Sequence, residues 1–103
     1  MVEWATLETQ AGDDFREFCE VHGRIRNDST RNHAVTLHFT AFNPQGRLIG
    51  GAVTSEKFVA AGGRSTYRAE FGPTFSLEQG FAGGLSDCDK VHRFEVEIDA
   101  RPV

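Results

Sequence analysis

Four histidines and two cysteines are the side chains of this sequence that would most readily build a metal site. Zinc needs about three or four such ligands converging on it, and ligands on one face of a strand stand two residues apart. No His-x-His, His-x-x-His or Cys-x-x-Cys pattern occurs, and the nearest approach is Cys88 with His92. We therefore expect no metal and no cofactor. Three histidines are interpreted as solvated surface residues: His22, His38 and His92.

Cys88 and His92 also raise the question of nucleophilic catalysis, in which an imidazole activates a thiolate. Asp87 and Asp89 flank Cys88 and would raise the pKa of its thiol, which is the wrong direction for activation. The spacing of the two aspartates suits Ca²⁺, but the later Gly and Glu of a calcium-binding loop are missing. This segment therefore predicts neither a nucleophile nor a calcium site.

The remaining patterns have simpler structural interpretations. The glycine-rich stretch Gly80–Gly84 is not followed by the Lys and Ser or Thr of a phosphate-binding loop, so it is interpreted as a turn. Other acidic pairs are interpreted as solvated loop and strand residues: Asp13 with Asp14, and Glu95 with Glu97. Because no catalytic constellation remains, we predict that the chain is not an enzyme.

The composition favours one small all-β domain, residues 1–103. Nine residues are Phe and eleven are Gly, against a single Met, Trp and Tyr. Phe suits a pleated, half-buried surface, and Gly suits turns. The net charge of −4 leaves no surplus of cations for a phosphate backbone or an anionic membrane surface. We therefore expect no nucleic acid partner and no membrane insertion.

Two features bear on cellular location. Residues Met1–Glu8 have neither the basic nor the apolar region of a signal peptide. Cys19 and Cys88 are compatible with one disulfide or with two buried thiols in a reducing cytosol, and we favour the thiols. We expect a cytoplasmic protein, unless the chain is a fragment of a larger exported protein.

Apolar and polar residues alternate along most of the chain, which is the period of a half-buried strand. The clearest example places Val35, Leu37 and Phe39 on one face. About seven such strands separated by turn signals in a chain of 103 residues predict an antiparallel, immunoglobulin-like β-sandwich. The last strand is expected to turn three side chains inward: Phe94, Val96 and Ile98. The expected strands are 2–6, about Phe15 to Arg26, 34–42, 47–54, 57–60, 65–71 and 91–98.

Several of these strands and turns are arranged as in a known family. The matching stretches are Val21–Asn27, Val35–Asn43 with Gly46, Ala61–Ser65 and the strand through Tyr67. In these stretches the chain resembles the FxLYD domain, a small immunoglobulin-like module. Within residues 39–43 it keeps the Phe of the naming motif and has Ala, Phe and Asn in place of Leu, Tyr and Asp. The resemblance implies a sandwich fold and carries no catalytic motif.

Residues 72–90 form a connection much longer than the roughly two to five residues of a β-hairpin loop. Ser76 is placed to cap one helical turn over Leu77–Gly80. One interpretation is a lid, in which Phe75 and Phe81 cover an open end of the sandwich. The other is a contact surface made of exposed apolar side chains. That surface would consist of Phe75, Leu77, Phe81 and Leu85.

We predict a non-enzymatic protein-binding or assembly module that binds a protein partner or a second copy of the chain. One alternative is an inhibitor of a cellular enzyme that acts through the loop 72–90, which would have to be rigid to bind well. Another is a small-molecule or metal-binding sandwich that uses the histidines.

Overall fold

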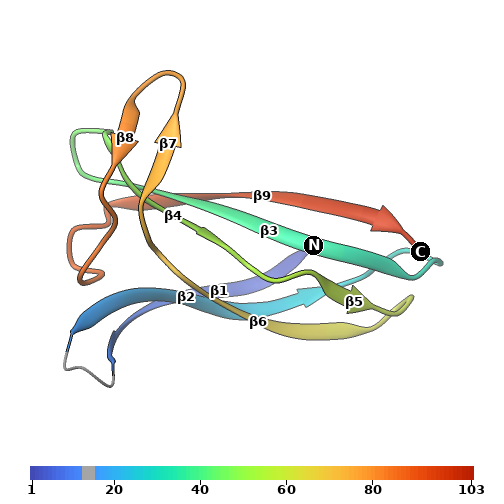
Figure 1. Ribbon diagram of the computed structural model, residues 1–103. Helices are drawn as coiled ribbons and strands as arrows, with labels where there is room; N and C mark the ends of the chain where they lie inside the picture. The colour runs from blue at the N-terminus through green and yellow to red at the C-terminus, as the bar shows by residue number, and fades with distance from the viewer. Residues whose placement is uncertain (13–15) are drawn as a thin grey trace.

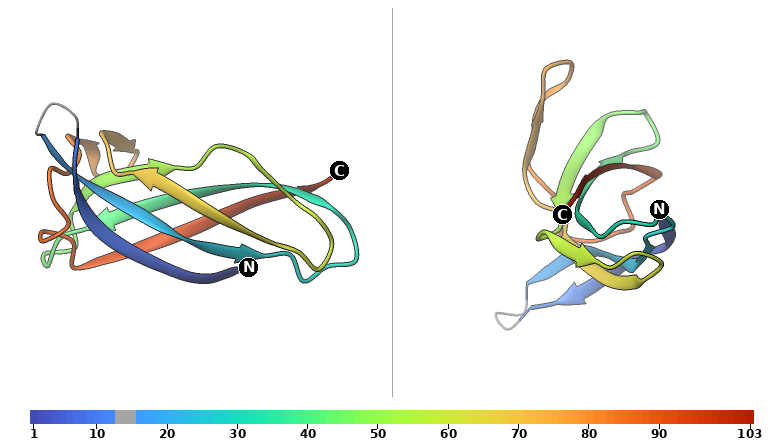
Figure 2. Two further views of the ribbon diagram at one scale, coloured as in Figure 1. Left: turned by 90° about the horizontal axis from the view of Figure 1, so that it is seen from below. Right: turned by 90° about the vertical axis from the view of Figure 1, so that its right-hand side faces the viewer.

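The computed structural model describes residues 1–12 and 16–103 (Figures 1 and 2). This part of the chain folds into β1 (Val2–Ala11), β2 (Glu17–Arg26), β3 (His33–Phe42), β4 (Leu48–Val53), β5 (Lys57–Val59), β6 (Arg64–Glu70), β7 (Thr74–Ser76), β8 (Gly80–Ala82) and β9 (Arg93–Pro102). None of the described residues forms a helix that could cross a bilayer. The predicted all-β class is confirmed. The expected strand start at Phe15 and the acidic pair Asp13–Asp14 lie outside the described residues.

The strands form two main layers and one small hairpin, and every pairing is antiparallel. The first layer has the order β1-β2-β6. In the second layer, β3 pairs along one edge with β4 and β5 and along the other with β9. The hairpin of β7 and β8 extends away from both layers (Figure 1). The arrangement is a sandwich in which β2 and β3 are the central strands of their layers.

The period-two alternation of the central strands places their apolar side chains between the layers, as predicted. The inward residues of β2 and β3 are buried: Cys19, Val21, Gly23 and Ile25 in β2, and Val35, Leu37, Phe39 and Ala41 in β3. From β6, Tyr67 and Ala69 point to the same interior. The predicted core faces of these three strands are confirmed.

Phe39 is the aromatic centre of this core. Its ring stacks on Tyr67 of the opposite layer at a centroid distance of 5.7 Å. It also meets Phe71 edge-on at 6.5 Å and lies 6.0 Å from Phe94. Aromatic pairs in such offset or edge arrangements stabilise a core beyond the area that they bury. Phe39 therefore links β6 in one layer with β9 in the other.

A backbone irregularity in β1 depends on the absence of a side chain at Gly23. The pairing of β1 with β2 shifts register between Val2 and Trp4. The Tyr67 hydroxyl donates a hydrogen bond to the Trp4 carbonyl oxygen at 3.0 Å, and burial raises the pKa of this phenol. A Cβ on Gly23 would lie 2.0 Å from that carbonyl oxygen and 2.6 Å from the Tyr67 hydroxyl. Only glycine leaves room for this hydrogen bond.

Cys19 and Cys88 form a disulfide, so the expectation of two free thiols was wrong. Their Cα atoms are 4.9 Å apart, although 69 positions separate them in the sequence. The Cys88 N–H also donates to the Thr9 hydroxyl at 2.9 Å. These contacts attach the long connection before β9 to both β1 and β2. The pairing depends on the three-dimensional path of the chain, which two isolated cysteines do not reveal.

The predicted helical turn over Leu77–Gly80 was also wrong, because these residues form the tip of the β7–β8 hairpin. The Ser76 hydroxyl does accept a hydrogen bond from the Gln79 N–H at 2.9 Å, but it does so across a three-residue hairpin loop. Gly80, the first residue of β8, follows this loop with a φ of 76°. A positive φ after a short turn matches the strand twist and returns the chain as a hairpin.

Gly23→Ala should destabilise the fold by about 2 kcal/mol or more, because the added Cβ would displace the Trp4 carbonyl and the Tyr67 hydroxyl. Urea unfolding followed by circular dichroism measures the change. Gly83→Ala is the matched control, since a Cβ there meets nothing within 4 Å. Equal stabilities for the two variants would contradict the packing described for Gly23.

Replacing both cysteines, as in Cys19→Ala with Cys88→Ala, should lower the free energy of unfolding by about 2–4 kcal/mol. The physical reason is that the unfolded chain gains freedom when the cross-link is absent. Urea unfolding of the oxidised protein and of the double variant measures the difference. A reductant should destabilise the wild type and leave the variant unchanged. Two reactive thiols in the denatured, unreduced wild type would show that the disulfide is absent.

Candidate functional site

The β7–β8 hairpin extends away from the two layers (Figure 1), and its large apolar side chains are exposed to solvent. Phe75 and Phe81 are directly paired across the two strands, so their rings lie on the same face. Their exposed fractions are 66% and 73%, and Leu77 in the loop is 97% exposed. We call these three residues the hairpin tip. Large apolar side chains gathered in this way on a surface commonly mark a binding site.

The base of the hairpin is held against the second layer by backbone hydrogen bonds. Gly51 of β4 and Gly72 exchange two of them, at 3.0 and 2.8 Å. Thr74 packs on Gly51, where a Cβ would come within 2.9 Å of the threonine side chain. The base of the hairpin is therefore held at the edge of β4 by two hydrogen bonds and by the close packing of Thr74.

Gln79 fixes the outer end of the hairpin to the β3–β4 turn. Its side-chain oxygen accepts a hydrogen bond from the Leu48 N–H at 2.6 Å, and its amide nitrogen donates to the Gly46 carbonyl at 3.4 Å. The Gln79 side-chain amide thus satisfies one backbone N–H and one backbone carbonyl, as a neighbouring strand would. The hairpin tip therefore has a defined orientation in the free protein. This reduces the conformational entropy that the hairpin would lose on binding a partner.

A hollow of about 450 Å³ lies between the hairpin and this turn. It combines an apolar ring with charges of both signs: its lining residues are Arg47, Leu48, Glu78, Gln79 and Phe81. Phe81 therefore belongs both to the hairpin tip and to the lining of this hollow. This combination of an apolar anchor with neighbouring polar groups is common at protein interfaces.

The structure divides the four residues that the sequence predicted as a contact surface. Phe75, Leu77 and Phe81 are exposed together, whereas Leu85 belongs to the core and packs close to Gly50. Leu85 is therefore unavailable to a partner. The lid interpretation is wrong for the two phenylalanine rings, because most of the surface of each is exposed to solvent. The covering role falls to Leu85 and to Ala82.

The histidines do not converge. No group of three potential metal ligands occurs within residues 1–12 and 16–103. His22 lies 3.1 Å from a Glu8 carboxylate oxygen and contacts the Trp4 ring edge-on, while His33 is held by Ser29 at 3.2 Å. The other two histidines, His38 and His92, are exposed. The geometry thus gives the histidines local structural contacts rather than a shared site.

The segment around Cys88 has a structural explanation. Cys88 is bonded to Cys19, so in this state it offers no thiolate to His92. Asp87 accepts a hydrogen bond from the Asp89 N–H at 3.0 Å, which stabilises a turn. In the glycine-rich stretch, Gly80 and Gly84 have φ of 76° and 94°, as turns of this kind require.

A charged cluster that the sequence did not predict surrounds Glu3. The carboxylate forms ion pairs with Arg24 and Arg26 of β2 and with Arg64 of β6. The hydrogen bond from Arg64 is the largest influence that lowers the pKa of Glu3, and Arg24 adds to it. Arg26 also pairs with Asp28. The three arginines are therefore engaged with acidic side chains and do not form an anion site.

Comparison of the chain with models of known protein families and with curated proteins finds no match to either.

Glu3→Gln should make the fold less sensitive to acid. Because the pKa of Glu3 is lowered in the folded state, its ionised form stabilises the fold above the unfolded value of 4.5 and this contribution is lost as the pH falls through the folded value. Urea unfolding at about pH 6 and about pH 3 measures the loss. The wild type should lose more stability over this interval than the variant, and equal losses would contradict the role of the ion pairs.

Proposed function

We propose that the chain is a non-enzymatic protein-binding or assembly module whose contact surface is the hairpin tip. The observation that carries this proposal is the joint exposure of Phe75, Leu77 and Phe81 on a hairpin fixed at both ends. Aromatic side chains at the centre of an interface contribute a large share of its binding energy. The bound molecule is another protein or a second copy of the chain.

The fixed orientation of the hairpin favours one related function, that of an inhibitor which inserts the hairpin tip into a cleft of an enzyme. Inhibitory segments bind tightly when their bound conformation already exists in the free protein. The Gln79 side chain supplies that constraint here, because it accepts a hydrogen bond from the Leu48 N–H and donates one to the Gly46 carbonyl. In either case the same three side chains make the contact.

We also propose that the module belongs to the immunoglobulin-like folds and is related to the FxLYD domain. The two antiparallel layers and the buried face of Val35, Leu37 and Phe39 support this proposal. The disulfide removes one of the two grounds on which a cytoplasmic location was expected, since disulfides persist in oxidising compartments. We accordingly propose that the module works in such a compartment.

The double variant Phe75→Ser with Phe81→Ser should fold normally and lose binding. Both rings are exposed, so we expect stability to change by no more than about 1 kcal/mol. Self-association is measured by size-exclusion chromatography with light scattering. Capture of a partner is measured in native extract, and affinity for the purified partner should fall at least about thirtyfold.

Phe58→Ser is the matched control, because Phe58 is 63% exposed but lies on β5, away from the hairpin. This control should retain every interaction of the wild type. Unchanged binding by the hairpin variant, or equal loss by both variants, would contradict the proposed surface. Unfolding of the hairpin variant would show that the rings support the fold.

A further inference from the structure

The sandwich is closed along one side and open along the other. On the closed side, the chain passes from β6 through the buried Phe71 to the edge of β4. On the open side lie β1 and β9, the outer strands of the two layers (Figure 2). Val96 and Ile98 of β9 pair with the buried residues Phe39 and Leu37 and so face inward, as predicted. They nevertheless remain 40% and 42% exposed.

The free edge of β9 offers a row of backbone groups without partners in the described part of the chain. The Val103 N–H donates to the Asn32 carbonyl at 3.0 Å, which fixes the hydrogen-bonding phase of the β3–β9 ladder. Because successive residues of a strand point their backbone groups to opposite edges, Val96, Ile98 and Ala100 direct theirs away from β3. Pro102, which has no N–H, falls on the same free edge, where prolines are tolerated.

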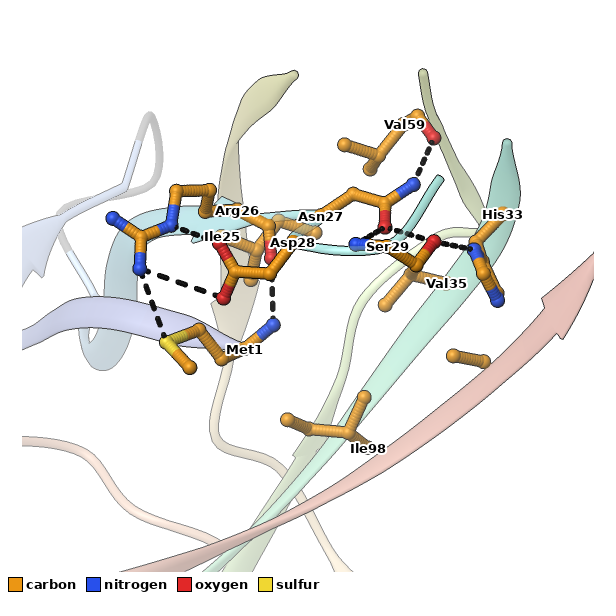
Figure 3. A pocket seen from close by; sticks show the side chains of 11 residues that line it. Met1, Ile25, Arg26, Asn27, Asp28, Ser29, His33, Val35, Val59 and Ile98 are labelled. Carbon is orange, nitrogen blue, oxygen red and sulfur yellow. Dashed lines mark hydrogen bonds and ion pairs between the residues drawn. The ribbon is translucent and has the colours of Figure 1, made fainter. Parts of the chain in front are cut away.

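An apolar groove runs beside this edge (Figure 3). It has a volume of about 230 Å³, and its apolar lining comes from both layers: Met1, Ile25, Val35, Val59, Ile98 and Ala100. The polar residues at its rim are already engaged. Asn27 donates to the carbonyls of Arg31 and Val59, and Ser29 contacts Asn27 and His33. The groove therefore suits an apolar side chain of an added strand.

The outer face of β9 carries a row of acidic side chains. Arg93 lies 4.1 Å above the Phe42 ring and pairs with Glu95 at 3.2 Å. Arg101 is engaged by Glu56 at 3.3 Å. In the part of the chain that the structure describes, no ion pair involves the other two acids of this row, Glu97 and Asp99.

We propose that the free edge of β9 binds a β-strand of a partner protein in which apolar residues alternate with Lys or Arg. The backbone of that strand pairs with Val96, Ile98 and Ala100, and one apolar side chain enters the groove. Its cations lie beside Glu97 and Asp99. A second copy of the chain fits this edge poorly, because it would bring one acidic row beside another. This surface is separate from the hairpin tip.

The test uses the full chain and a synthetic peptide of about nine residues that alternates valine with lysine. Binding is followed through backbone amide signals and amide hydrogen exchange. The N–H groups of Val96, Ile98 and Ala100 should become protected, while those of Glu97 and Asp99, already directed to β3, should change little. Two control peptides should bind at least tenfold more weakly: one with glutamate in place of lysine, and one with the same composition in two blocks.

Two variants separate the charge from the edge. The double variant Glu97→Lys with Asp99→Lys should bind the lysine peptide at least tenfold more weakly than the wild type. It should bind the glutamate peptide more tightly than the wild type. Ile98→Pro removes one free-edge N–H without breaking the ladder to β3, and it should abolish binding of both peptides. Circular dichroism and thermal unfolding confirm that each variant is folded.

The proposal is overturned if the lysine peptide binds more weakly than about 1 mM. Indifference to the charge reversal would also overturn it, as would self-association of the wild type through β9. Protection that appears at the hairpin tip instead of β9 would overturn this inference and would leave the proposed function standing. If no partner binds the hairpin tip but the peptide still binds β9, the proposed function is wrong and this inference stands.

Discussion

The bond between Cys19 and Cys88 is the constraint on which the arrangement of the molecule depends. Cys19 lies in the buried face of β2, and Cys88 lies in the connection that leads from the second layer to β9. The bond, together with the hydrogen bond from Cys88 to Thr9, holds the second half of this connection against the first layer. Leu85, three positions before Cys88, is thereby kept in the core.

This attachment explains why the other half of the connection is free to project. The stretch after Leu85 is fixed by the disulfide, and the stretch before Thr74 is fixed by the pairing of Gly51 with Gly72. Between these two points only Ala82 of the large or apolar side chains is buried, and Phe75, Leu77 and Phe81 are exposed. This segment forms a short hairpin, because Gly80 supports the turn and Gln79 bonds to the neighbouring loop. The exposed apolar residues of the hairpin therefore follow from how its two ends are held.

Much of the fold could be predicted from the sequence because period-two alternation is a strong local signal. The core faces of β2, β3 and β6 follow from it directly, as Val21, Phe39 and Tyr67 show. The ends of the outer strands could not be predicted in this way, because β1 continues to Ala11 and β9 to Pro102, beyond the stretches of clear alternation. The additional residues are held by pairing with β2 and β3, which is a property of the sheet rather than of the segment.

The candidate site was only partly predictable. Strands of three residues, such as β7 and β8, are too short for alternation to be distinguished from a helical pattern, and the cap-like placement of Ser76 favoured the wrong element. The apolar content of residues 72–90 predicted a lid or a contact surface, but it could not assign Leu85 to the core and Phe81 to the surface. That division depends on the disulfide and on Gly50, both of which act between distant parts of the chain.

The separation of the hairpin from the core has a consequence for how this protein can change over evolution. Phe75, Leu77 and Phe81 are largely exposed, so the residues of the proposed contact surface can vary while those that maintain the fold are retained. New side chains can be placed at these three positions while Thr74, Gln79 and Gly80 keep the hairpin in its orientation. The same independence makes this segment a natural place for grafting foreign peptides onto the scaffold.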